Sequence, residues 1–133
     1  MAEVTITGFS HVGIRVHDLE RSRKFYELLG FEFIVGPVGP EPVAIMKHPA
    51  GIEINFILNA PESETPNVLM DVEGKKPGYT HIALACADLD AAAKALEAAG
   101  HEITGRMEFL PGFHGMFVRD PDRNVVELNH DSR

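Results

Sequence analysis

The chain has 133 residues, of which 44% are hydrophobic, so it has room for one compact domain with a real core. Twelve Lys and Arg against twenty Asp and Glu give a formal net charge of −8, which repels nucleic-acid phosphates and anionic membrane surfaces. We therefore expect neither nucleic acid nor a membrane as a partner. The single cysteine excludes an intrachain disulfide framework, and the sequence shows no secretory leader, which together predict a cytoplasmic protein.

Two segments of the chain, residues 11–33 and 81–103, align without a gap at an offset of 70 residues. This many identities exceeds what average residue frequencies supply by chance, so we interpret the match as an internal duplication. The identical positions are His11/His81, Asp18/Asp88, Leu19/Leu89, Lys24/Lys94, Glu27/Glu97, Gly30/Gly100 and Glu32/Glu102.

Both copies predict the same series of elements in chain order. In each, an alternating strand leads to an Asp in the N-cap position of a helix, and a Gly suited to the left-handed conformation ends that helix. The predicted helices cover residues 19–29 and 89–99. Beyond them, the apolar alternation predicts strands over residues 31–35, 43–47 and 52–58 in the first copy and 102–108, 115–119 and 125–130 in the second.

The predicted fold is therefore of the α+β class, with two βαβββ modules that form a curled mixed sheet around a shared cavity. We place the modules at residues 8–59 and 78–130 of a single domain. Residues 60–77 hold prolines, a glycine and several charges without periodicity, and we interpret them as the linker between the modules.

Four metal-ligating side chains occupy the open faces of the predicted strands. Side chains alternate between the two faces of a strand, so the apolar positions pack under the helix and leave His11, Glu53, His81 and Glu127 on the other face. A single His or Glu is ordinary on the solvent-exposed face of a strand. A His on the first strand and a Glu on the last strand of both copies is a coincidence that indicates a shared site. Two imidazoles and two carboxylates suit one divalent ion, Ni²⁺, Zn²⁺, Co²⁺, Mn²⁺ or Fe²⁺, and leave positions open for substrate oxygens.

The motifs of both copies resemble those of the vicinal oxygen chelate superfamily, which includes glyoxalase I, extradiol dioxygenases, fosfomycin-resistance enzymes and bleomycin-binding proteins. The resemblance covers nearly the whole chain. It is carried by SHVGIRVHDLERSRKFYELLGFE, GIEINFI, YTHIALACADLDAA and FVRDPDRNVVEL. It implies the fold described above, a small-molecule substrate, and a homodimer, since single-chain relatives of this length usually pair.

Within that superfamily the ligand pattern is most similar to glyoxalase I (lactoylglutathione lyase). The resemblance implies that the four residues named above hold the metal and that Glu127 and Glu53 are the catalytic carboxylates. Glu127 would move a proton between neighbouring carbons of a substrate that is chelated through vicinal oxygens. Arg15 corresponds to the arginine that binds the substrate carboxylate, and we expect Asn55 and His114 to contribute to substrate binding.

Two other functions stay open at this stage. His11, His81 and Glu127 alone would make the triad of an Fe(II) extradiol-type dioxygenase or of a fosfomycin-type resistance enzyme. A metal-free drug-binding protein is the second alternative, because the acidic surface would attract a cationic drug. The apolar stretch 109–113, which we expect in a loop together with His114, favours a substrate less polar than a glutathione adduct.

Overall fold

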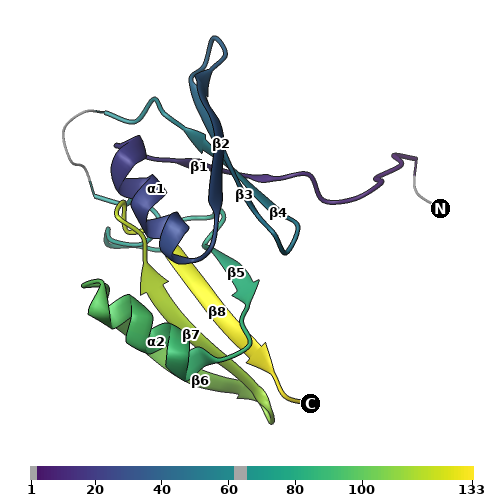
Figure 1. Ribbon diagram of the computed structural model, residues 1–133, viewed down its shortest axis with the longest axis vertical. Coiled ribbons are helices and arrows are strands. Elements are labelled where there is room, and N and C mark those ends of the chain that lie inside the picture. Colours follow the sequence, from purple (N-terminus) through teal and green to yellow (C-terminus); the bar gives the residue numbers. More distant parts are fainter. Residues whose placement is uncertain (1–2, 62–65) are drawn as a thin grey trace. The chain divides into compact units, whose positions relative to one another are not determined.

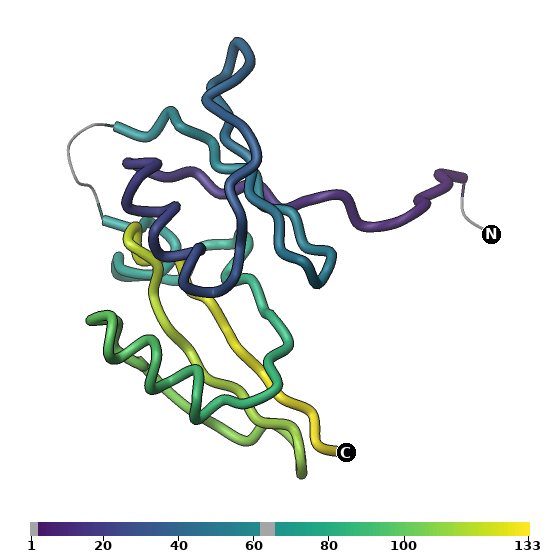
Figure 2. The backbone as a smooth tube through the Cα atoms, in the orientation of Figure 1, coloured from purple at the N-terminus to yellow at the C-terminus, as the bar shows by residue number. Residues whose placement is uncertain are grey.

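The computed structural model describes residues 3–61 and 66–133 and divides the chain into two compact units. Unit 1 is Met1–Glu62 and unit 2 is Ser63–Arg133. Each contains one helix and one four-stranded sheet among its described residues. Figure 1 labels these elements, and Figure 2 traces the backbone in the same orientation.

Unit 1 has the predicted βαβββ order. Its strand order in the sheet is β1-β4-β3-β2, with β1 parallel to β4 and the other neighbours antiparallel. The parallel pair follows from the helix, which carries the chain back before the second strand begins. The elements are β1 (Val12–Arg15), α1 (Leu19–Leu28), β2 (Glu32–Val38), β3 (Val43–His48) and β4 (Ile52–Ile57).

Unit 2 repeats this arrangement with the strand order β5-β8-β7-β6, in which β5 is parallel to β8. The prediction of two βαβββ modules is therefore confirmed, and each sheet is open instead of closed into a barrel. The elements are β5 (His81–Ala85), α2 (Leu89–Ala98), β6 (Ile103–Leu110), β7 (Phe113–Arg119) and β8 (Val125–Asp131).

The two helices begin at the predicted caps. The Asp18 carboxylate accepts a hydrogen bond from the Glu20 amide at 3.0 Å, and Asp88 accepts one from the Ala91 amide at 3.0 Å. Gly30 and Gly100 follow the helices with φ of +96° and +89°, which a residue with a Cβ adopts only at a cost. Each helix ends one residue earlier than predicted, because the residue before the glycine already forms the cap.

The core of each unit lies between its helix and one face of its sheet. In unit 1, the Tyr26 ring is fully buried and makes a perpendicular contact with Phe25, at 5.1 Å between ring centroids, and a tilted contact with Phe56 at 5.3 Å. In unit 2, Leu96 from the helix is buried, as are Met116 and Val126 from the sheet. The other face of each sheet carries the four predicted metal ligands.

The hairpin between β6 and β7 is shorter than predicted. The stretch 109–113 and His114 were expected in a loop, but β6 continues to Leu110 and β7 begins at Phe113, so His114 lies within a strand. The expectation was wrong because Pro111 and Gly112 suffice for the turn: Gly112 has φ of +86°, the left-handed value that a tight turn needs. The aromatic residues on either side are thereby drawn into the sheet.

Residues 66–77 of the predicted linker belong to unit 2, while residues 60 and 61 belong to unit 1. The Asp71 carboxylate accepts hydrogen bonds from Arg123 Nε at 2.6 Å and from Arg119 Nη1 at 3.2 Å, and Asn67 Nδ2 donates to Asn124 Oδ1 at 3.0 Å. The Arg123 hydrogen bond, with help from Arg119, lowers the pKa of Asp71 below its ordinary 3.8. Residues 62–65 of the linker lie outside the described residues.

Among the residues that are described, no helix is long and apolar enough to cross a membrane.

Candidate metal centre

In unit 2 the two predicted ligands lie side by side on neighbouring strands. Parallel pairing of β5 with β8 places His81 opposite Val125 and Ala83 opposite Glu127. The side chains meet across this register, with His81 Nε2 3.1 Å from Glu127 Oε1. Glu127 is only 6% exposed, which is unusual for a carboxylate and requires compensating partners.

Glu127 has a second partner, Asn129, which stands two residues farther along β8 and therefore on the same face. Asn129 Nδ2 donates a hydrogen bond to Glu127 Oε2 at 2.9 Å. The two carboxylate oxygens thus have different roles: Oε2 is held by an amide, and Oε1 faces the imidazole. On the far side of the ring, Thr80 Oγ1 lies 2.8 Å from His81 Nδ1, so the imidazole is fixed from both sides.

Unit 1 contains the corresponding pair in a looser form. His11 Nδ1 lies 3.9 Å from Glu53 Oε2, and the Glu53 side chain is 26% exposed. Ser10 Oγ contacts His11 Nδ1 at 2.9 Å, as Thr80 contacts the histidine of unit 2. The two units differ in the second neighbour of the carboxylate. In unit 1 this neighbour is Lys47, which is directly opposite Glu53 in the sheet and whose Nζ lies 3.6 Å from Glu53 Oε1. In unit 1 an ammonium group, not an amide, is therefore the second neighbour of the carboxylate.

The predicted substrate-binding residues of unit 1 lie on β1 and β4. Arg15 stands on β1, and its Nε donates to Asn59 Oδ1 at 2.8 Å while Nη2 is 3.9 Å from a Glu41 carboxylate oxygen. Asn55 follows Glu53 on the same face of β4. Its Oδ1 is buried and has no hydrogen-bond partner among the described residues, so it keeps an unused acceptor.

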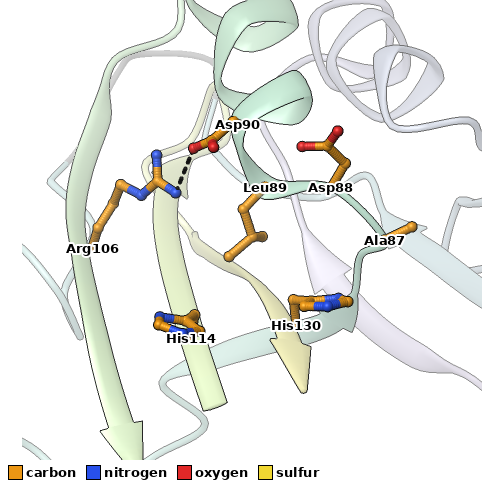
Figure 3. Close-up of a pocket in the computed structure, with 7 residues that line it drawn as sticks. All are labelled: Ala87, Asp88, Leu89, Asp90, Arg106, His114 and His130. Carbon is orange, nitrogen blue, oxygen red and sulfur yellow. Dashed lines mark hydrogen bonds and ion pairs between the residues drawn. The ribbon is translucent and has the colours of Figure 1, made fainter. Parts of the chain in front are cut away.

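His114 does not lie beside Glu127. Phe117 is opposite Glu127 in the sheet, and His114, three residues before Phe117 on the same strand, points to the other face. There its Nε2 is 3.2 Å from Glu108 Oε2. It lines an open pocket of about 370 Å³ at the start of α2, drawn in Figure 3. We therefore leave His114 out of the metal centre, and a role in substrate binding stays a prediction.

Aromatic rings flank the His81 and Glu127 pair, which the sequence analysis did not anticipate. The Phe117 ring is perpendicular to the His81 ring with 6.3 Å between centroids. Phe109 contacts both Phe117 at 6.2 Å and Phe113 at 5.9 Å. No pattern in the sequence indicated them, because the residue that lies opposite Glu127 depends on the register between the strands.

A family model matches almost the entire length of the chain. It describes the Glyoxalase/Bleomycin resistance protein/Dioxygenase superfamily and covers residues 8–128. The chain belongs to this superfamily. This confirms the resemblance inferred from the duplicated motifs. A separate search of the curated proteins found no match.

Solved structures of superfamily members share the fold over the whole chain. A glyoxylase/bleomycin resistance protein/dioxygenase domain from Frankia sp. EAN1pec is 25% identical, with 97% of this chain and 95% of that chain covered and a TM-score of 0.74. A glyoxalase family protein from Bacillus cereus has 20% identity, 98% coverage of both chains and a TM-score of 0.76. The fosfomycin resistance protein FosX from Listeria monocytogenes, in a glutamate-to-glutamine variant with Mn(II) and 1S,2S-dihydroxypropylphosphonic acid, has 19% identity, coverage of 96% and 95%, and a TM-score of 0.74.

The donor groups present fit a divalent cation. In unit 2 an imidazole nitrogen and a carboxylate oxygen face each other at 3.1 Å, and the other carboxylate oxygen accepts a hydrogen bond from the uncharged amide of Asn129. A cation would compensate such a group. Among the described residues, neither unit by itself brings three or more His, Cys, Asp or Glu side chains close enough together to hold a metal ion. Each unit offers one half of the predicted set, and the joining of the halves stays a prediction.

Proposed function

We propose that the chain is a divalent-metal-dependent enzyme of glyoxalase I type, which isomerises a small substrate chelated through vicinal oxygens. The observation that supports it best is the pair of His81 and Glu127, whose facing atoms are 3.1 Å apart while Glu127 is nearly excluded from solvent. A buried carboxylate that is aimed at an imidazole is a ready half-site for a metal. His11 and Glu53 would supply the other half, within one chain or from a second chain in a homodimer.

The protein's own groups have distinct tasks in this proposal. The metal, when bound, would polarise the substrate oxygens and make the neighbouring carbon-bound proton more acidic. Glu127 would take that proton and return it to the adjacent carbon. Asn129, by holding Oε2, keeps the carboxylate in one orientation during both transfers. Burial of Glu127 also keeps water away from the proton while it is held.

Cationic side chains of unit 1 would bind the acidic end of the substrate. Arg15 and Lys47 both stand on the face that carries His11 and Glu53, and their side chains are 60% and 57% exposed. Both groups have carboxylate neighbours, Glu41 for Arg15 and Glu53 for Lys47, and exposed ion pairs of this kind are weak enough to be exchanged for a substrate anion. The proposal therefore assigns carboxylate recognition to Arg15, as the resemblance implies, with Lys47 as an additional positive charge.

A second candidate function rests on the weakness of the Glu53 contact. Glu53 lies 3.9 Å from His11 and is paired with Lys47, so it is less well prepared than Glu127 to bind a metal. With Glu53 left out, His11, His81 and Glu127 would form a two-histidine, one-carboxylate triad of the kind used in extradiol dioxygenases and in fosfomycin resistance. The similarity in fold to FosX, which was solved with Mn(II), is compatible with this reading.

One set of assays distinguishes the two candidates. Purified protein is loaded in turn with Ni²⁺, Zn²⁺, Co²⁺, Mn²⁺ and Fe²⁺ and tested on methylglyoxal plus glutathione, on catechols with oxygen uptake, and on fosfomycin with water or thiols. Isomerase turnover that is lost in both Glu127→Gln and Glu53→Gln supports the glyoxalase type. Activity on a catechol or fosfomycin that survives Glu53→Gln supports the triad. The absence of metal binding in the wild type overturns both.

A further inference from the structure

Three phenylalanine side chains form a continuous surface on unit 2, which we call the aromatic wall: Phe109, Phe113 and Phe117. Phe109 is the central member, because its ring lies 5.9 Å from the Phe113 ring and 6.2 Å from the Phe117 ring. Phe109 is also 42% exposed, so part of its ring surface is open to solvent. Arg133 lies over the Phe113 ring, with Cζ 5.4 Å from the ring centroid, so the open part of the wall is the surface around Phe109.

The aromatic wall is continuous with the proposed metal-binding pair. Phe117 is directly opposite Glu127 in the antiparallel pairing of β7 with β8, so their side chains share one face of the sheet. The Phe117 ring also meets the His81 ring at right angles, 6.3 Å between centroids. Any molecule bound to a metal at His81 and Glu127 would therefore have the wall as its neighbour.

Gly115 makes room for the central ring. It stands between Phe113 and Phe117 on β7, and a Cβ built there would lie 2.3 Å from Phe109 Cε2. Real side chains never approach so closely, so Phe109 can lie across β7 only because residue 115 has no side chain. The Phe109 ring therefore lies over Gly115 and next to the Phe117 ring.

The corresponding face of unit 1 is aliphatic and charged instead of aromatic on its third strand, where Val43, Ile45 and Lys47 lie on the same face as Glu53. The residue that faces Glu53 across the sheet is Lys47, where unit 2 has Phe117 facing Glu127. The duplicated fold by itself does not demand an aromatic residue at this position, since one copy does without it. The wall belongs to unit 2 alone.

We propose that the aromatic wall binds an apolar group, preferably an aryl group, of the substrate whose vicinal oxygens are held at His81 and Glu127. This inference rests on the proposed function and narrows it to substrates that carry such a group next to the chelating oxygens. An exposed ring surface that begins at the metal-binding pair fits a planar apolar substituent, because offset and perpendicular ring contacts stabilise it beyond simple burial. A substrate that is polar throughout would leave the wall unused.

Two hydroxamates test the inference without knowledge of the natural substrate. Acetohydroxamate and benzohydroxamate chelate a metal through the same two adjacent oxygens and differ in a methyl against a phenyl group. Their dissociation constants are measured by titration calorimetry on protein loaded with Co²⁺ or Ni²⁺, and on metal-free protein. We expect metal-dependent binding of both and a preference for benzohydroxamate of roughly tenfold, from the added ring contacts.

Variants of the wall identify the source of the preference. Phe109→Ser removes the central ring, and Gly115→Ala displaces it; each should reduce the preference to about twofold or less without changing the affinity for the metal. Val68→Ser is the matched control, since it removes an exposed apolar side chain of unit 2 away from the wall. Equal affinities in the wild type, as expected if protein covers the wall, overturn the inference and leave the proposed function intact. Failure of both hydroxamates to bind metal-loaded protein overturns the proposed function.

Discussion

The replacement Glu127→Gln probes the metal centre with the smallest change in shape. It removes one negative charge from the position that faces His81 at 3.1 Å. The new amide carbonyl can still accept the hydrogen bond that Asn129 donates to the carboxylate in the wild type. The variant should therefore fold normally, and its defect should appear only when a divalent metal is present.

The size of the defect follows from the burial of the carboxylate. Glu127 is 6% exposed, and at an effective dielectric constant of about 20 two unit charges 4 Å apart attract each other by about 4 kcal/mol. A buried glutamine side chain carries no charge, so it avoids the free-energy cost of keeping a charge out of water. This saving offsets part of the lost attraction between the carboxylate and the metal. We expect a net loss of about 2.7 kcal/mol, or about a hundredfold weaker metal binding. At saturating metal the stabilisation falls by the same amount, which for 133 residues corresponds to about 10 °C in Tm.

The assay compares thermal unfolding with and without Ni²⁺ or Zn²⁺, together with direct titration of the metal. Glu108→Gln is a matched control, because Glu108 pairs with His114 at a similar 3.2 Å but on the other face of the sheet. That variant should keep the metal affinity of the wild type. Equal metal affinity in Glu127→Gln and wild type would refute the reasoning. So would a loss of stability that is the same with and without metal, since it would make the pair purely structural.

Three further predictions follow from the contacts around the two pairs and from the linker. Asn129→Ala should weaken metal binding by about 10- to 100-fold, measured by chelator competition, because it releases the ligand Glu127; a wild-type affinity would contradict the positioning role. Lys47→Met should tighten metal binding by up to about fivefold, because an exposed ion pair of this kind with Glu53 is worth at most about 1 kcal/mol; weaker binding would show that Lys47 supports the site. The lowered pKa of Asp71 means that its contribution to stability is present above pH 3.8 and is lost as the pH falls below it. Asp71→Asn should therefore be less stable than the wild type at neutral pH and should lose less stability on acidification, in urea unfolding at several pH values; parallel curves would contradict this.

The fold could be predicted from the sequence because its signals are local and occur twice. Asp18 and Asp88 begin the helices, Gly30 and Gly100 follow them, and apolar alternation marks the strands; each of these depends on neighbouring residues alone. Alternation also sufficed to place His81 and Glu127 on one face, since a strand has only two faces. The hairpin at Pro111 was predicted to be a longer loop, because a two-residue turn has no polar stretch that would mark its short length in the sequence.

The neighbours of the ligands could not be predicted, because they depend on the register between strands. Which residue stands opposite Glu127 or Glu53 is set by the lengths of the hairpins, and the sequence gives those lengths only to within a residue or two. A shift of one residue would have put a core side chain in place of Phe117 or Lys47. The Asn129 hydrogen bond was missed for a different reason: an Asn two residues after a Glu has many ordinary roles on a strand.

Metal-edge anomalous diffraction from crystals grown with Co²⁺ or Zn²⁺ tests the central claim most directly. We predict one strong peak per chain, bonded to the imidazoles of His11 and His81 and to the carboxylates of Glu53 and Glu127, whether these come from one chain or from two. A peak bound by other residues, or no peak while His81 and Glu127 remain in direct contact, would contradict the account.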